Sequence, residues 1–314
     1  MNQIPFDALI VAAGKPRQDS SFYPARNLGS LSVIRRIIHT FRQAGASTIL
    51  VVTGYQAKDL EKHLARSSVI CIRNDAWETT DMMYSVKLGL LRFQDGDGNL
   101  LLTPADIPLF TLSTVKKLLQ SGAPLAVPGI GGRNGHPLLI SKHLIPQLLS
   151  YEGTLGLRDA VLKTGVPKKV IEVYDEGVLF DVENETEYDT LLERHNRQPF
   201  CPRVMVSLER ELPFFDRDAA MLLRLVEQVH SVRKACSLMG ISYSKGWKIL
   251  NEMELQSGIT KIKRKAGVQT GGSTELTSKG LAFLKRFEQF EKNISRFAAS
   301  EFYRIFPDMR DNDE

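Results

Sequence analysis

The sequence predicts an α/β domain with a mostly parallel sheet, followed by a smaller domain built mainly of helices. From about residue 8 to residue 196, short β-branched runs alternate with amphipathic segments, which is the pattern of βαβ units. Two prolines in residues 197–203, RQPFCPR, break this pattern, and helical periodicity follows them. We therefore expect one domain over residues 1–198 and a second over residues 199–314.

A chain of 314 residues with 43% hydrophobic content can bury the two cores that this organisation needs. No apolar run approaches the roughly 20 residues that a membrane-spanning helix requires, and the first residues do not resemble a secretion signal. We therefore expect a cytoplasmic protein with no membrane partner. The three cysteines are odd in number and far apart, so we expect buried, reduced thiols at Cys71, Cys201 and Cys236.

Six segments begin the first domain, in the order strand, helix, strand, helix, strand, strand: residues 8–14, 33–45, 48–54, 57–67, 69–74 and 99–106. The strand segments are apolar and mostly rich in valine, isoleucine and leucine, whereas the helical segments are amphipathic. In an open α/β sheet, ligands bind outside the carboxyl ends of the strands. The loops that follow four of the strands should therefore converge on one crevice, namely those after Ala13, Thr53, Asn74 and Leu102.

The first of these loops, in ALIVAAGKPR, places a glycine and several backbone N–H groups at a strand end. Such a loop lets a phosphate approach the backbone closely. The chain has neither the GxxxxGK[ST] pattern of a P-loop nor GxGxxG, so the sequence predicts neither a P-loop nor a dinucleotide-binding fold.

Five further motifs follow in order: VVTGYQA, NDAWETTDMMYSVKLGL, LLTPADIPL, GRNGHPLLIS and FDVENETEYDTLL. Together with the first loop they resemble the MobA/MocA-type nucleotidyltransferase family over residues 6–196. The resemblance implies a Rossmann-like fold of the nucleotide-diphospho-sugar transferase type. It also implies transfer of a nucleotide from a nucleoside triphosphate to the phosphate of molybdopterin. The Ala-Ala-Gly of the first loop resembles the cytidylyltransferase branch, so CTP is the favoured nucleotide.

The resemblance assigns site residues to three groups. Nucleotidyl transfer brings two anions together and needs a divalent cation held by carboxylates, and Asp106 and Asp181 resemble the family's catalytic, Mg²⁺-binding positions. The expected nucleotide-binding residues are Ala12, Ala13, Gly14, Lys15, Arg17, Ser85 and Gly89. The expected acceptor-substrate residues are Gly135, His136 and Pro137.

Four of these polar side chains also have a structural interpretation, which the sequence leaves open. Asp106 can cap a turn beside two prolines, and Asp181 can cap a helix. Ser85 can be a capping or solvated serine. We interpret His136 as an orienting or packing residue, because a lone histidine is more often structural than catalytic.

One departure from the family pattern concerns catalysis. Where the family has a lysine, this chain has Tyr23, and a tyrosine is neutral at pH 7. The same loop contains Asp19, whose charge repels a triphosphate. Nearby cations could compensate, namely Lys15, Arg17 and Arg26. The first domain is therefore either a divergent transferase or a sensor that binds a nucleotide or a molybdopterin species; a plain nucleotide-binding scaffold is the third interpretation.

The second domain contains a predicted helix-turn-helix. Residues 216–230 form an amphipathic helix, and residues 231–254 predict two more helices around a tight turn at Gly240. Ser231 and Ser242 are placed to cap these two helices. The second helix opens with short polar donors and lysines, as does a recognition helix that enters the major groove. The DNA-binding residues expected on it are Ser242, Tyr243, Ser244, Lys245 and Lys248.

A basic hairpin is predicted over residues 259–280, and a short strand over residues 204–208. The hairpin can lie along a phosphate backbone as a wing, or it is a solvated charged hairpin. Residues 203–286 carry 15 Lys and Arg against 8 Asp and Glu, a net charge of +7 in a segment the length of one small DNA-binding domain. The expected DNA-binding residues of the wing are Lys261, Lys263, Arg264 and Lys265.

The stretch from PRVMVSLERELPFF to LTSKG resembles the DNA-binding domain of ModE, the molybdate-responsive regulator, which is a LysR-like winged helix-turn-helix. A long terminal helix follows. Its apolar stripe either pairs with a second copy in a homodimer or packs on its own domain: Leu281, Leu284, Phe287, Phe290, Ile294 and Phe297. The two resemblances imply a transcription regulator of molybdenum metabolism with DNA as a partner. An active cytidylyltransferase with an autoregulatory DNA-binding tail is the alternative.

Overall fold

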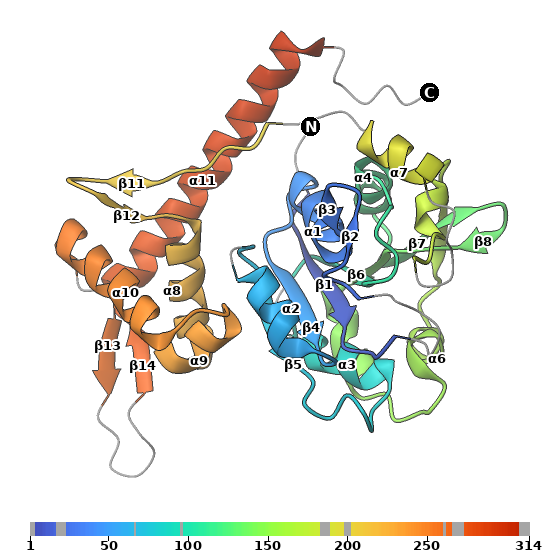
Figure 1. Ribbon diagram of the computed structural model, residues 1–314, viewed down its shortest axis with the longest axis horizontal. Helices are drawn as coiled ribbons and strands as arrows, with labels where there is room; N and C mark the ends of the chain where they lie inside the picture. The colour runs from blue at the N-terminus through green and yellow to red at the C-terminus, as the bar shows by residue number, and fades with distance from the viewer. Residues whose placement is uncertain are drawn as a thin grey trace. The chain divides into compact units, whose positions relative to one another are not determined.

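The computed structural model of the protein describes residues 4–16, 23–65, 67–94, 97–182, 189–197, 202–259, 262–265 and 273–307. The chain divides into two units (Figure 1). The first comprises Met1–His63 and Val69–Gln198, and the second comprises Leu64–Ser68 and Pro199–Glu314. Among the described helices, none is long and apolar enough to cross a membrane.

An eight-stranded sheet forms the centre of the first unit, with the strand order β10-β7-β9-β6-β1-β4-β5 and with β8 paired to β7. Four neighbouring strands run parallel: β6 (Asn99–Pro104), β1 (Phe6–Ala12), β4 (Ile49–Thr53) and β5 (Ile70–Arg73). The other parallel pair is β7 (Leu125–Ile130) with β10 (Lys169–Glu172), and the antiparallel strands are β8 (Arg133–Asn134) and β9 (Leu138–Ser141). The predicted α/β fold with a mostly parallel sheet is therefore confirmed.

The first unit also contains seven α-helices and a short ribbon within its described residues. The helices are α1 (Val33–Gln43), α2 (Ala57–Leu64), α3 (Met82–Leu90), α4 (Leu112–Gln120), α5 (Ile145–Leu149), α6 (Gly156–Lys163) and α7 (Asp189–Asn196), and the ribbon is β2 (Asn27–Leu28) with β3 (Leu31–Ser32). Helix α1 shows the predicted amphipathic spacing, since Ile34, Ile37 and Phe41 recur every three or four residues and are fully buried. Strand β4 is buried along its whole length, which explains its uninterrupted apolar sequence.

A buried carboxylate, that of Asp175, joins the segment after β10 to the start of α4. It accepts hydrogen bonds from the backbone N–H and hydroxyl of Thr111 (2.7 and 2.9 Å) and from the hydroxyl of Thr114 (2.5 Å). It also accepts from the N–H of Gly177 (3.1 Å). Gly177 has no space for a side chain, because a β-carbon there would lie 2.1 Å from the carbonyl oxygen of Leu109. Polar and steric contacts together therefore fix this segment.

His136 lies in the turn between β8 and β9, where its N–H donates to the carbonyl of Val178 (2.9 Å) and its bond to Pro137 is cis. Its Nδ1 is buried and has no hydrogen-bond partner among the described residues. Burial lowers the pKa of the imidazole to about 4, so His136 is neutral at pH 7. A β-carbon on Gly135 would lie 2.5 Å from the Val178 carbonyl oxygen, so the whole turn packs tightly.

The second unit contains three helices between two hairpins, followed by a long helix (Figure 1). In chain order the elements are β11 (Leu208–Glu209), β12 (Pro213–Phe215), α8 (Arg217–Val229), α9 (Val232–Leu238), α10 (Tyr243–Ser257), β13 (Ile262–Lys265), β14 (Ser273–Leu276) and α11 (Ser278–Ile305). Strands β11 and β12 pair antiparallel, as do β13 and β14. The prediction of a strand over residues 204–208 is wrong, because only Leu208 in that stretch has a partner strand among the described residues.

Side-chain caps begin α9 and α10. The hydroxyl of Ser231 accepts a hydrogen bond from the N–H of Lys234 (3.3 Å), and that of Ser242 accepts from Lys245 (3.2 Å), so both predicted caps are confirmed. The two helices approach closely at Gly246, where a β-carbon would lie 2.1 Å from Sγ of Cys236.

The cysteines that the structure describes are buried free thiols, as expected for Cys71 and Cys236. Burial raises the pKa of the Cys71 thiol to about 12, so it stays protonated at pH 7. Cys201 lies outside the described residues.

The long helix α11 is buried mainly in its first half. Phe215 contacts Phe283 and Phe287, with ring centroids 4.8 Å apart in each pair. In the second half, Phe290 and Phe297 keep 46% and 68% of their surface exposed. Packing on its own domain therefore accounts for the first half of the predicted apolar stripe, whereas the second half presents apolar side chains to solvent.

We predict that Asp175→Ala lowers the free energy of unfolding of the first unit by roughly 3 kcal/mol, because it leaves buried donors without an acceptor. The neighbouring Glu176→Ala should cost well under ~1 kcal/mol, since its ion pair with Arg194 is exposed. Urea titration of Trp77 fluorescence in a Trp247→Phe background would follow the first unit alone. Equal losses in the two variants would contradict this account of Asp175.

The first unit should lose stability as the pH falls from about 6.5 to about 4. His136 and His195 have a pKa of about 4 in the folded protein, against 6.5 without burial, so the unfolded chain binds more protons in this window. Below pH 6.5, each histidine lowers the free energy of unfolding by at most about 1.4 kcal/mol for each pH unit. Above pH 6.5 this loss is absent, because both states hold the histidine neutral. The same urea titration at several pH values should show a shallower pH dependence for His136→Gln. An identical slope in His136→Gln and in the unmodified protein would contradict the assignment.

Candidate functional site

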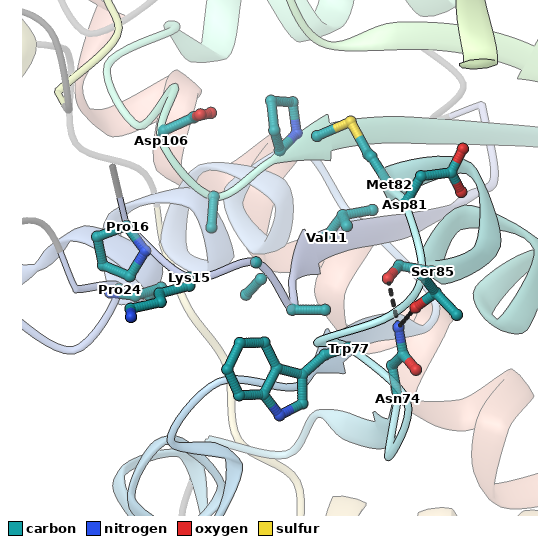
Figure 2. Close-up of a pocket in the computed structure, with 16 residues that line it drawn as sticks. Val11, Lys15, Pro16, Pro24, Asn74, Trp77, Asp81, Met82, Ser85 and Asp106 are labelled. Atoms are coloured by element: carbon teal, nitrogen blue, oxygen red, sulfur yellow. Dashed lines mark hydrogen bonds between the residues drawn. The ribbon is translucent and has the colours of Figure 1, made fainter. Parts of the chain in front are cut away.

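A cavity of about 220 Å³ lies at the carboxyl ends of β1, β5 and β6 (Figure 2). Backbone hydrogen bonds beyond the strand ends hold its loops together. The Ala105 N–H donates to the Val11 carbonyl (2.9 Å) and the Tyr55 N–H to that of Ala13 (2.9 Å). The Asn74 N–H donates to the carbonyl of Thr53 (2.7 Å) in the same way. The four loops predicted to converge on one crevice are thus brought together.

Four of the predicted nucleotide-binding residues lie at the end of β1 and in the loop after it, and they line the cavity: Ala12, Ala13, Gly14 and Lys15. The loop after β4 packs directly against this loop, because a β-carbon on Gly54 would lie 2.4 Å from the Ala13 carbonyl oxygen. Any other residue at Gly54 would therefore displace the loop after β1. Arg17 and Asp19 lie outside the described residues.

The opposite wall of the cavity comes from the segment after β5 and from the start of α3. Ser85 lines this wall, and Asp81 caps α3 by accepting a hydrogen bond from the N–H of Tyr84 (2.9 Å). The side-chain amide of Asn74 donates to the hydroxyls of Thr80 (2.9 Å) and Ser85 (3.0 Å). Figure 2 shows the bond between Asn74 and Ser85 at the cavity edge.

Gly89, also predicted to contact the nucleotide, is not among the residues that line the cavity. A β-carbon there would lie 2.4 Å from Cδ1 of Leu9. The absence of a side chain at Gly89 therefore lets α3 pack on β1. Gly135, His136 and Pro137 are also outside the cavity lining, in the turn between β8 and β9.

The two acidic residues predicted to bind a metal are held close along the backbone. Asp106 follows β6 and lines the cavity. Asp181 is not in the lining, but the next residue, Val182, donates its N–H to the carbonyl of Asp106 (2.9 Å). Within the described residues, no group of three or more His, Cys, Asp or Glu side chains could hold a metal unaided. Asp106 and Asp181 would supply two carboxylates. This fits Mg²⁺, which commonly takes one or two carboxylates and completes its coordination shell with substrate phosphates.

Tyr23, which the sequence resemblance aligned with a lysine of the family, does not line the cavity. Its hydroxyl donates to the backbone carbonyl of Gln56 (3.2 Å). Burial, with smaller effects of Asp59 and Tyr55, raises the pKa of the phenol, so Tyr23 is neutral at pH 7. Among the described lining residues Lys15 is the one cation, and two carboxylates, those of Asp81 and Asp106, line the same cavity.

In the second unit, the predicted DNA-binding side chains of α10 are all exposed: Ser242, Tyr243, Ser244, Lys245 and Lys248. The guanidinium of Arg233 on α9 lies 4.8 Å from the centroid of the Tyr243 ring and adds a cation to this surface. In the hairpin, the exposed Lys263 lies 3.8 Å from Glu275. Lys261 lies outside the described residues, as do the side chains of Arg264 and Lys265.

Sequence reasoning missed five residues of the cavity wall after β5, namely Asn74, Trp77, Thr80, Asp81 and Met82. All five lie in the motif NDAWETTDMMYSVKLGL, from which only Ser85 and Gly89 were selected. An available signal was Asp81 itself, which stands where an N-cap belongs before the apolar α3 segment.

Residues 8–168 match the family described as the MobA-like NTP transferase domain. The molybdenum cofactor cytidylyltransferase of Escherichia coli (strain K12) is 28% identical over 152 residues, which cover 48% of this chain and 76% of that relative. The bifunctional protein GlmU of Pseudoalteromonas atlantica is 30% identical over 118 residues, and this match covers 37% of this chain and only 25% of GlmU.

Among solved structures, a nucleotidyl transferase from Methanothermobacter thermautotroptrophicus superposes with a TM-score of 0.53 at 20% sequence identity. The superposition covers 62% of this chain and 99% of that one, so the two share a fold. The geometry of the cavity and the match over residues 8–168 lead to one conclusion: the chain belongs to the MobA-like NTP transferase family.

Proposed function

We propose that the protein is a cytoplasmic transcription regulator of molybdenum metabolism, in which the first unit binds CTP with Mg²⁺ and the second binds DNA. The observation that carries the proposal is the charge of the nucleotidyltransferase cavity. Lys15 is the one cation among the described lining residues, and Tyr23, which the resemblance aligns with the family's lysine, bonds to Gln56 outside the lining. Within its described residues, such a site can bind a nucleotide but lacks a positive charge that transition-state stabilisation requires.

The cavity supports nucleotide binding through its backbone. The loop at Ala13 and Gly14 offers N–H groups where a phosphate can approach, and Lys15 adds a positive charge. The printed name of the Escherichia coli relative refers to a cytidylyltransferase for the molybdenum cofactor. We therefore favour CTP as the nucleotide and a molybdopterin species as a second ligand.

Asp106 and Asp181 would hold the Mg²⁺ ion. Asp106 lines the cavity, and the backbone bond from Val182 keeps Asp181 next to it in the fold. The bound ion would neutralise negative charge on the triphosphate and polarise its phosphoryl oxygens. Without the ion, Asp81 and Asp106 would repel a polyphosphate, so CTP binding should require the metal.

The alternative is an active cytidylyltransferase that transfers a nucleotide from CTP to molybdopterin and uses its tail for autoregulation. Loss of one transition-state charge typically costs ~10² to 10³ in rate. Tyr23 donates its hydroxyl proton to the Gln56 carbonyl and is neutral at pH 7, so residue 23 supplies no positive charge, which favours the sensor.

DNA binding is supported by the exposed start of α10. A helix that enters the major groove needs short hydrogen-bond donors and cations on its N-terminal turns. Ser244, Lys245 and Lys248 meet this requirement, and Arg233 extends the basic surface. The hairpin of β13 and β14 would lie along the phosphate backbone as the wing of a winged helix-turn-helix.

A homodimer is the assembly we propose for the DNA-bound protein. Phe290 and Phe297 lie seven residues apart on α11 and are exposed, which is the spacing of a coiled-coil seam. Pairing of two copies would present two α10 helices to a two-fold symmetric site.

Tyr23→Lys should raise the rate of pyrophosphate release from CTP in the presence of Mg²⁺ and molybdopterin by at least about tenfold, because it restores the missing charge. The unmodified protein should bind CTP but release pyrophosphate only slowly. Tyr174→Lys adds the same charge at a side chain that is 95% exposed and serves as the control. Sustained turnover by the unmodified protein would establish the enzyme instead, and an unchanged rate in Tyr23→Lys would show that this position has another role.

Lys245→Ala and Lys248→Ala should each weaken binding to a selected DNA duplex by about five- to tenfold and reduce its salt dependence by about one counterion. Lys292→Ala removes an exposed lysine from α11 and should leave affinity unchanged. Fluorescence anisotropy with a duplex selected from a random library measures both quantities. Equal affinities for the selected duplex and for random DNA would contradict specific recognition.

A further inference from the structure

Helix α9 and the first turns of α10 carry positive charge without any acidic residue. Residues 231–251 contain four lysine or arginine residues and no aspartate or glutamate. All four are exposed, and none of them forms an ion pair with a described residue: Arg233, Lys234, Lys245 and Lys248. Exposed cations that gather in one stretch without acidic partners create a surface that attracts a polyanion.

Arg233 differs from the lysines because an aromatic ring lies against its side chain. Its guanidinium carbon lies 4.8 Å from the centroid of the Tyr243 ring, which belongs to the first turn of α10. The Tyr243 ring in turn meets Trp247 edge-on, with centroids 6.2 Å apart and planes at 86°. The Ser242 hydroxyl caps α10 directly before Tyr243. Tyr243 is therefore fixed by its own helix, and it restricts where Arg233 can point.

The guanidinium of Arg233 keeps its hydrogen-bond donors available. No described residue accepts a hydrogen bond from it. A guanidinium holds its N–H groups in one plane, and paired donors of this kind match the oxygens of a phosphate group. Because the Tyr243 ring already restricts the side chain, less conformational entropy is lost when a phosphate binds. Arg233 is thus preorganised to hold an anionic oxygen.

We propose that Arg233 binds a phosphate of the DNA backbone, and that Tyr243 is a positioning residue that acts through Arg233 and not by contacting DNA itself. This inference rests on the proposed DNA binding of the second unit. Arg233 lies on α9, the helix before the one proposed to enter the major groove. In a helix-turn-helix, that earlier helix crosses the backbone, where it meets phosphates and not base edges. The contact therefore adds affinity for every sequence.

Two substitutions separate the charge of Arg233 from its orientation. Arg233→Ala should weaken binding to a selected duplex and to random DNA by the same factor, about five- to tenfold, and lower the salt dependence by about one counterion. Tyr243→Leu removes the ring but keeps the cation, so affinity should fall about two- to fivefold while the salt dependence stays the same. Fluorescence anisotropy over a range of salt concentrations measures both quantities.

A double variant and a conservative variant test whether Tyr243 acts through Arg233. If it does, Tyr243→Leu should cost no further affinity once Arg233→Ala is present. Tyr243→Phe keeps the ring and should restore the affinity lost in Tyr243→Leu. The control Arg210→Ala removes an exposed arginine next to Glu211, whose N–H bonds to Gln256 near the far end of α10, and should not change affinity. Circular dichroism confirms that each variant is folded.

Undiminished DNA binding by Arg233→Ala, or a loss confined to the selected duplex, overturns the phosphate contact. Arg233→Ala changes only an exposed side chain, so this result does not depend on how well Tyr243→Leu folds. Additive losses in the double variant overturn the positioning role of Tyr243, because each side chain would then act independently. If the unmodified protein binds neither duplex, the proposed DNA binding itself fails, which separates that failure from the failure of this inference.

Discussion

The cavity depends on backbone hydrogen bonds that extend past the ends of the parallel strands. Ala105 bonds to Val11 and Tyr55 bonds to Ala13, so the loops after β1, β4 and β6 cannot move independently. The close approach of Gly54 to the Ala13 carbonyl adds a steric limit to the same junction. Because these contacts use main-chain atoms, the loops stay together while their side chains vary, and chemistry is set by which side chains they carry.

Much of the first unit could be predicted from sequence, because its central strands are largely buried and therefore mostly apolar. The rule that parallel strands end at one edge also placed the loops of Ala13 and Asp106 together. It could not give the direction of single side chains. Tyr23 bonds to Gln56 outside the cavity lining, and Gly89 makes room for Leu9. Both arrangements depend on contacts between residues that are far apart in the sequence. The polar wall at Asn74 was missed for the same reason.

The second unit shows a similar division between local and long-range information. The caps at Ser231 and Ser242 were predictable, since a cap depends only on the next three residues. The division of α11 into a buried first half and an exposed second half could not be predicted in this way. A helix of 28 residues is about 42 Å long, which exceeds the core that a small unit offers, so only its first half finds apolar neighbours such as Phe215. The apolar periodicity of α11 continues along the helix, so the sequence pattern alone does not show where the buried part ends.

Calorimetric titration of CTP into the protein, with and without Mg²⁺, tests most directly whether the cavity is a nucleotide site organised around Asp106. The account predicts one CTP per chain, at least about tenfold tighter binding with Mg²⁺, and loss of this metal effect in Asp106→Asn. Equal binding without the metal, or an Asp106→Asn protein that keeps the full Mg²⁺ effect, would contradict it.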